Sequence, residues 1–172
     1  MPIKNILITG KPRCGKTTLV MKIIKQLDSA GGFFTQEFRQ DNQRIGFKIT
    51  SLQGKEGILA REGFRSKFRL GRYGINLKDL EEIGVIAIEE AINKKEVVII
   101  DEIAKMELFS KDFKNAVLKA LNSKKRVLGT IQQRDLPFLK QIKARPDLIV
   151  LELKVDNREE IYKKLKEEFS YG

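Results

Sequence analysis

An eight-residue glycine loop near the N-terminus constrains this chain more than any other feature. Residues 10–17 read Gly-Lys-Pro-Arg-Cys-Gly-Lys-Thr and match the pattern G-x-x-x-x-G-K-[ST] at every fixed position. The short apolar run Ile6–Ile8 precedes the loop. A strand, this loop and a helix in that order predict a phosphate-binding P-loop, the Walker A motif. The helix is indicated by apolar residues at helical spacing, which are Leu19, Val20, Ile23, Ile24 and Leu27.

The residue types in the loop suit a polyphosphate. Gly10 and Gly15 let the backbone turn so that its N–H groups point inward around a phosphate. The helix that follows adds the positive end of its dipole. Lys16 is expected to neutralise the β and γ phosphates, while Thr17 ligates Mg²⁺ and Thr18 contacts the α phosphate. The expected nucleotide-binding residues of the loop are therefore Gly10, Lys11, Pro12, Arg13, Cys14, Gly15, Lys16, Thr17 and Thr18.

A second element ends in two acids. The β-branched run Val97–Ile100 is followed by Asp101 and Glu102. A continuous apolar run of this kind predicts a strand buried on both faces of a parallel sheet, so that its carboxyl end meets the crevice beside the loop. We expect Asp101 to hold Mg²⁺ together with Thr17. Glu102 is placed to orient and deprotonate the attacking water, so Glu102 and Lys16 are the expected catalytic residues, and both acids join the nucleotide-binding set.

The order of elements predicts the fold class. Strands alternate with helices, which favours an α/β architecture with a doubly wound, mainly parallel sheet. Alternating residues over about 33–60 predict antiparallel hairpins inserted after the first helix, which Gly31 and Gly32 are expected to end. The length of 172 residues suits one domain over 1–172. Later helices are expected to begin at caps, namely Asn76, Ser110, and either Asp156 or Asn157.

Composition excludes several classes of site. The chain contains no His and one Cys. A His-based triad, a His-ligated metal, an internal disulfide and a Cys-rich zinc site are therefore ruled out. Cys14 is either a filler at a variable loop position or a reactive thiol at a helix N-terminus. No signal peptide or membrane-spanning run is visible, so a reducing, cytoplasmic setting is expected.

The chain is basic, with 34 Lys and Arg against 23 Asp and Glu and a net charge of +11. Two interpretations stay open. The excess charge attracts nucleic acid, acidic lipid or phosphates, or it reflects a Lys/Glu-rich surface such as hyperthermophile proteins carry. Interleaved Lys and Glu over 159–168 favour the second interpretation. Nucleic acid is therefore not the favoured partner, and no obligate protein partner is implied.

Other side chains are candidates for contact with a nucleotide. An arginine stabilises the charge that spreads over the phosphoryl group in the transition state. Lys105 either reaches the site or packs its stem across the sheet edge. No N-K-x-D motif follows an apolar strand, so weak base selectivity is expected. The arginine candidates are Arg39, Arg69, Arg72, Arg134 and Arg145.

Aromatic residues offer a surface on which a base can stack. Tyr73, next to Arg72, is the better candidate for this role. Phe33, Phe34 and Phe38 are better suited to the core of the expected hairpin, because they lie along one of its strands.

Several segments together resemble one known family. Residues 101–110 read Asp-Glu-Ile-Ala-Lys-Met-Glu-Leu-Phe-Ser and are similar to D-E-I-G-K-M-E-L-F-S. Shorter matches are residues 32–39 to G-F-Y-T-E-E-V-R, 44–47 to R-I-G-F, 69–73 to R-V-G-Q-Y, 128–131 to L-G-T-I and 156–158 to E-N-R. These are motifs of the small nucleoside-triphosphatase family first described from thermophiles, whose animal members are called cancer-related nucleoside-triphosphatase. The chain departs from them at Ala104, which replaces a glycine, and at Gln132, which replaces a proline.

The resemblance implies a P-loop α/β fold and a cytoplasmic protein. It also implies Mg²⁺-dependent hydrolysis of ATP, GTP, CTP and UTP to the diphosphate and phosphate. Two alternatives stay open. A nucleotide or nucleoside kinase would use the Arg61–Arg72 stretch as an arginine-rich lid over an acceptor. A nucleic-acid-associated ATPase would use the basic charge, and its binding would fall steeply with salt.

Overall fold

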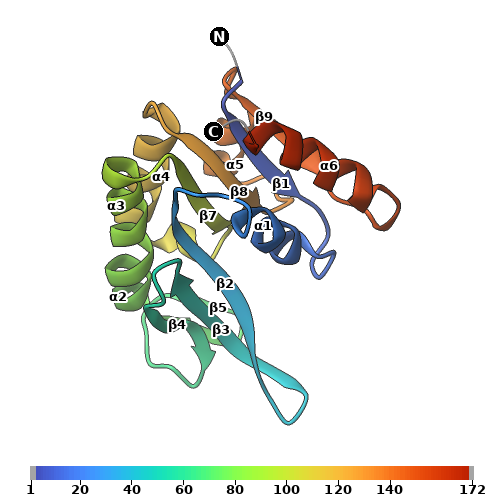
Figure 1. The fold of residues 1–172 in the computed structure, drawn as a ribbon. Coiled ribbons are helices and arrows are strands. Elements are labelled where there is room, and N and C mark those ends of the chain that lie inside the picture. The colour runs from blue at the N-terminus through green and yellow to red at the C-terminus, as the bar shows by residue number, and fades with distance from the viewer. Residues whose placement is uncertain (1–2, 171–172) are drawn as a thin grey trace.

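One nine-stranded sheet organises the computed structural model, which describes residues 3–170 (Figure 1). The strand order is β5-β6-β4-β3-β2-β7-β8-β1-β9. The parallel part consists of β1 (Asn5–Thr9), β7 (Val97–Ile103), β8 (Arg126–Ile131), β9 (Leu148–Glu152) and the start of β2 (Ala30–Gln40). The prediction of an α/β fold with a mainly parallel sheet is confirmed.

The remaining strands form the predicted antiparallel insert. The second half of β2 pairs with β3 (Gln43–Ser51), which pairs with β4 (Glu56–Glu62). The insert continues beyond residue 60, because β4 also pairs with β6 (Tyr73–Ile75), and β6 with β5 (Arg69–Leu70). In Figure 1 the long β2–β3 hairpin projects below the parallel strands. This arrangement extends β2 past the edge of the sheet at which β7 ends.

The helices cover both faces of the sheet. Helices α1 (Lys16–Ile24) and α6 (Arg158–Phe169) contribute to one apolar core. The other core is covered by a helical segment of three parts, α2 (Leu77–Asp79), a π-helical turn (Leu80–Val85) and α3 (Ile86–Lys94), together with α4 (Lys111–Asn122) and α5 (Pro137–Lys143). Figure 1 shows α1 and α6 on one side of the sheet and α3 on the other. Two short 3₁₀ turns, Glu107–Phe109 and Val155–Asn157, complete the elements.

Strand β7 shows why the apolar run does not alternate. Val97 and Ile99 pack into the core under α1 and α6, whereas Val98 and Ile100 pack into the core under α3 and α4. All four side chains are buried. A strand with helices on both faces needs apolar residues in both directions, and the sheet therefore holds the end of β7 rigidly.

Local signals explain most of the helix starts. The Asn76 side chain accepts a hydrogen bond from the Asp79 N–H, and the Ser110 side chain accepts one from the Phe113 N–H. Both predicted caps are confirmed. Asn157 precedes α6 as predicted, but its side chain makes no cap and binds the loop behind it. None of the helices in residues 3–170 is both long enough and apolar enough to span a membrane.

The prediction that Gly31 and Gly32 end the first helix was wrong, since both lie in β2. At Gly32 the reason is space. Its φ is +118°, and a Cβ there would lie 2.0 Å from the Ile99 carbonyl oxygen of the neighbouring strand β7. The glycine is therefore needed for strand pairing and not for ending a helix.

We expect Gly32→Ala to lower the free energy of unfolding by at least about 3 kcal/mol, because backbone strain adds to an overlap that neither strand can relieve. Gly54→Ala is the matched control. Gly54 also has a positive φ, +99°, but nothing lies within 4 Å of its Cβ position, so its cost is about 1–2 kcal/mol. Chemical denaturation measures both; equal losses would contradict the overlap at Gly32.

Candidate nucleotide-binding site

The predicted site residues converge at one edge of the sheet. Strands β1, β7 and β8 run parallel, so their carboxyl ends lie together. The loop 10–17 leaves β1 and enters α1, and Gly15 at its end has a φ of +97°. Asp101 lies within β7, near the point where that strand reaches the same edge. The structure thus brings the loop and both acids together from positions more than eighty residues apart.

Asp101 is the buried centre of this edge, with 1% of its surface exposed. Its Oδ2 accepts a hydrogen bond from Thr17 Oγ1 at 2.8 Å, and its Oδ1 accepts one from Thr130 Oγ1 at 2.5 Å. Burial raises its pKa to about 6, and the charge of Glu102 raises it too, while the hydrogen bonds from Thr130, Thr17 and the Thr35 backbone act in the opposite direction. The carboxylate is thus fixed in place by hydroxyls from the loop and from β8.

Lys16 and Glu102 form the second contact of the site. Their Nζ and Oε2 atoms lie 3.2 Å apart, and Nζ also donates to the Gly10 carbonyl oxygen at 3.2 Å. The side chains are 12% and 26% exposed. The lysine is therefore held over the loop, with Glu102 as its counter-ion where a γ phosphate would compete for it.

The residues present fit a magnesium ion. Thr17 Oγ1 and Asp101 Oδ2 are both oxygen donors and lie 2.8 Å apart. Within residues 3–170, no group of three or more acidic or Cys side chains could hold a metal without further ligands. Mg²⁺ suits such a site, because it binds through one or two protein oxygens and takes its other ligands from phosphates and water.

An arginine cluster lies between the loop and the insert. Arg13 belongs to the loop and has a left-handed φ of 64°. Its Nε lies 3.4 Å from Oε1 of Glu37 on β2, while Arg39 and Arg44 approach the same carboxylate at 2.7 and 3.4 Å. Burial opposes the charge of Glu37, but the Arg39 hydrogen bond and the neighbouring cations lower its pKa overall. One carboxylate thus faces three guanidinium groups.

Tyr73 extends this cluster and does not offer a face for a base. Its ring is buried, 6% exposed, and packs edge-on against Phe47. Its hydroxyl accepts hydrogen bonds from Arg44 at 2.9 Å and Arg72 at 3.1 Å. Arg72 also pairs with Glu62 at 2.8 Å. The structure therefore places Arg72 in a network that stabilises the insert, and Tyr73 is unavailable for stacking.

Two of the other arginine candidates pair away from the loop, and the third, Arg134, follows β8 at the same edge as the loop. Arg145 pairs with Asp147, just before β9 begins and so at the opposite end of the parallel strands. Arg69 donates to the Phe64 and Arg72 carbonyl oxygens. Arg134 is exposed in the loop that follows β8. Of the predicted arginines, Arg39 is the one that shares a partner with a loop residue.

Lys105 lines a groove between the 3₁₀ turn and the start of α5. Its backbone N–H donates to the Gln132 side chain at 3.0 Å, and the Gln132 N–H donates to the Ile103 carbonyl oxygen. A proline at 132 would lack that N–H. Gln132, which directly follows β8, therefore makes hydrogen bonds to Ile103 and Lys105 of which a proline could make neither. The groove residues are Lys105, Leu108, Phe109, Lys114, Leu136, Pro137, Phe138 and Gln141.

Three residues near the loop escaped the sequence analysis. Thr130 lies in an apolar strand, and nothing in the sequence links its hydroxyl to Asp101. Arg158 donates to the Cys14 carbonyl oxygen at 2.9 Å; its place in the E-N-R-like segment was the available signal. Glu107 is 2% exposed, and its Oε1 has no hydrogen-bond partner. Burial, together with the charges of Glu102 and Asp101, raises the pKa of Glu107 well above its usual value.

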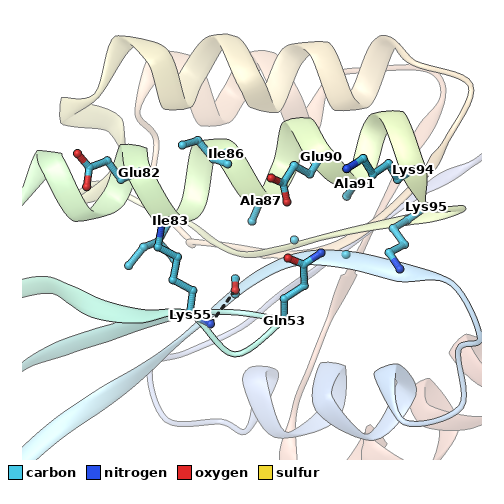
Figure 2. Close-up of a pocket in the computed structure, with 13 residues that line it drawn as sticks. Gln53, Lys55, Glu82, Ile83, Ile86, Ala87, Glu90, Ala91, Lys94 and Lys95 are labelled. Atoms are coloured by element: carbon cyan, nitrogen blue, oxygen red, sulfur yellow. Dashed lines mark hydrogen bonds between the residues drawn. The ribbon is translucent and has the colours of Figure 1, made fainter.

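A separate pocket lies between α3 and the start of β2 (Figure 2). It contains none of the loop residues and neither acid of β7. Figure 2 shows Glu82, Ile83 and Glu90 on the helical side and Gln53 and Lys55 opposite them. Its lining mixes acidic, basic and apolar side chains, so it does not favour a ligand of one charge or polarity.

Comparison with known proteins shows which family the chain belongs to. Residues 5–166 match the model of a family described as NTPase. The chain belongs to the NTPase family. It is 52% identical over 154 residues to nucleoside-triphosphatase THEP1 of Thermotoga sp. strain RQ2, covering 90% of this chain and 88% of that protein. The family resemblance read from the sequence is confirmed.

Solved structures of relatives share the fold of this NTPase. The crystal structure of THEP1 from Aquifex aeolicus has a TM-score of 0.87 at 39% identity and covers 96% of this chain and 98% of that one. The solution structure of a human cancer-related nucleoside triphosphatase has a TM-score of 0.80 at 32% identity, covering 94% and 95%. Ala104, which replaces a family glycine, is not among the residues with a positive φ, so the fold accepts it without strain.

We expect Glu107→Gln to gain stability over the wild type as the pH rises above the usual pKa of a glutamate carboxyl, about 4.3. In the wild type, burial keeps the carboxyl protonated to a higher pH in the fold than in the unfolded chain. Folding therefore takes up a proton, and wild-type stability falls with pH by up to about 1.4 kcal/mol per pH unit. Glutamine cannot ionise and escapes this loss.

Chemical denaturation at several pH values measures this difference. Glu89→Gln, at an exposed glutamate on α3, is the matched control substitution. A difference between wild type and Glu107→Gln that stays constant with pH would show that Glu107 does not have a raised pKa.

Proposed function

We propose that this protein hydrolyses nucleoside triphosphates, including ATP, GTP, CTP and UTP, to the diphosphate and phosphate with weak base selectivity. As a member of its family the chain is a nucleoside-triphosphatase enzyme. The observation that carries the proposal is the position of Glu102, next to Asp101 and 3.2 Å from Lys16. We further propose that one domain over residues 1–172 carries the activity, in the cytoplasm, where a lone cysteine stays reduced.

The residues of the site divide the work by position. The backbone N–H groups of residues 10–15, except Pro12, which has none, surround the phosphates, and Lys16 moves from Glu102 to the β and γ phosphates. Thr18 contacts the α phosphate. Release of Lys16 leaves the Glu102 carboxylate free to accept a proton from a water molecule lined up with the γ phosphorus.

The proposed metal ligands are Thr17 and Asp101. Bound Mg²⁺ would neutralise charge on the β and γ oxygens and orient them. Asp101 is held ready by Thr130, so its orientation does not depend on the ion. Thr17 needs only to turn its hydroxyl hydrogen away from Asp101 to expose an oxygen lone pair.

Two variants separate binding from chemistry. Lys16→Ala should abolish nucleotide binding, because no other described side chain bridges Gly10 and Glu102 over the loop. Glu102→Gln should keep binding, since it preserves shape, but lower kcat at least about 100-fold, because an amide cannot accept the proton. Calorimetry with ADP and phosphate-release assays measure the two effects. Tight binding by Lys16→Ala, or unchanged turnover by Glu102→Gln, would refute the assigned roles.

A second candidate function is phosphoryl transfer to an anionic acceptor. The arginine cluster favours it, because Arg13, Arg39 and Arg44 outnumber their shared carboxylate Glu37 beside the loop. In this reaction the γ phosphorus would break its bond to the β-phosphate oxygen and form one to an acceptor oxygen. The acceptor proton would pass to Glu102, and the diphosphate would leave.

Phosphate release from each of the four triphosphates with Mg²⁺ distinguishes the two candidates. The assay is run alone, with nucleosides or nucleoside monophosphates, and with RNA. Similar release from all four without any addition supports hydrolysis. Diphosphate that forms without phosphate release once an acceptor is added would overturn the hydrolase proposal and favour transfer, because the phosphoryl group then stays on the acceptor. Phosphate release that requires RNA would also overturn it and favour a nucleic-acid-dependent activity.

A further inference from the structure

The loop between β9 and α6 lies beside the phosphate loop without a role in the chemistry above. Strand β9 is the neighbour of β1 on the side away from β8 and β7. The Leu153 N–H donates to the Thr9 carbonyl oxygen at 2.8 Å, just before the phosphate loop begins. Residues 153–158 therefore adjoin the phosphate loop on the opposite side from Glu102.

This position determines which end of a nucleotide the loop meets. Glu102 lies at the γ-phosphate end of the site, because it pairs with Lys16 and is the proposed general base for the attacking water. In-line attack places the leaving diphosphate on the far side of the γ phosphorus from the water. A triphosphate whose γ phosphate lies at β7 and whose other phosphates follow the phosphate loop toward α1 therefore directs its nucleoside toward β9 and residues 153–158.

Arg158 covers this side of the phosphate loop. Its Nη2 donates to the Cys14 carbonyl oxygen at 2.9 Å. A Cβ built on Gly15 would lie 3.5 Å from Nη2, 3.6 Å from Cζ and 3.8 Å from Nε. An edge-on approach would leave the central carbon farther away than both nitrogens, so the guanidinium lies with one flat face over Gly15. The residue is exposed, and its other face is open to a ligand.

Two features of the segment 153–158 are unfavourable by themselves. Val155 is 82% exposed, one of three large apolar residues described as exposed. Arg158 is the first residue of α6, where the helix dipole disfavours a cation. An apolar side chain in water and a cation at the wrong helix end are local conflicts, which in folded proteins concentrate at functional sites.

The loop is nonetheless rigidly built. The Asn157 side chain accepts from the Lys154 N–H at 2.7 Å and donates to the Glu152 carbonyl oxygen at 2.9 Å. These two hydrogen bonds close the turn that presents Val155. Together with the hydrogen bond from Arg158 to Cys14, they hold the segment in one conformation, which lowers the entropy lost when a ring binds against it.

We infer that Val155 and the outer face of Arg158 form the nucleobase platform, a site for any purine or pyrimidine ring of a nucleotide bound at the phosphate loop. This inference rests on the proposed nucleotide binding and deepens it. Every base has a π face that stacks on a guanidinium plane or an apolar side chain without reading its edge. A platform of this kind gives affinity for all four bases and explains weak base selectivity by stacking.

Calorimetric titration with ADP and with inorganic pyrophosphate, both with Mg²⁺, tests the platform. Pyrophosphate fills the phosphate loop but has no base. Arg158→Ala should weaken ADP binding at least about tenfold, as expected for loss of one stacked base, and change pyrophosphate binding by less than about twofold. Arg158→Lys, which keeps the charge but loses the plane, should resemble Arg158→Ala. Lys164→Ala, an exposed cation on the same helix, should resemble wild type.

Each other outcome overturns the inference in an identifiable way. Equal losses for ADP and pyrophosphate would make Arg158 a support of the phosphate loop through Cys14. Wild-type ADP affinity in Arg158→Ala would show that the nucleobase binds elsewhere. Wild-type ADP affinity in Arg158→Lys would show that Arg158 contributes its positive charge and not a stacking plane. Failure of the wild type to bind either ligand would refute the proposed nucleotide site itself, which separates the two failures.

Discussion

The site depends on one buried carboxylate held between two hydroxyls. Asp101 can remain in the sheet interior because Thr17 and Thr130 satisfy its oxygens; without them, an isolated buried charge would be strongly disfavoured. The same contacts join the phosphate loop, β7 and β8 into one unit. Lys16 and Glu102 then take their positions as neighbours of residues already fixed. The geometry of the candidate site is therefore a consequence of sheet packing.

The charges around this centre are arranged in two zones. Toward β2, the loop meets arginines that share Glu37, which suits the γ-phosphate end and any anion beyond it. Toward β9, the loop meets Arg158 and the exposed Val155, which suit a flat ring. A nucleotide has the same polarity, with charge at one end and an aromatic ring at the other. The excess of basic residues in the chain is thus partly concentrated where a triphosphate would bind.

Local patterns predicted much of this molecule, and long-range contacts account for the rest. The phosphate loop, the β7 acids, the caps Asn76 and Ser110 and the inserted hairpins all carry short-range signals of spacing or residue type. Gly32 was misassigned because its clash is with Ile99, on a strand far away in sequence. Thr130 and Glu107 acquire their meaning from burial beside Asp101 and Glu102, and Tyr73 loses its expected role because the insert buries it. The burial of a single polar or aromatic side chain by distant segments produces no periodic pattern in the sequence, so it cannot be predicted from residue spacing.

The effect of Mg²⁺ on ADP affinity in Asp101→Asn shows whether the buried carboxylate of Asp101 holds the metal. We predict that Mg²⁺ tightens ADP binding to the wild type by at least about tenfold and that the variant loses this gain. Binding without Mg²⁺ should survive in the variant, because Lys16 and the loop remain. An Asp101→Asn protein that folds like the wild type and keeps the full Mg²⁺ effect would contradict the account.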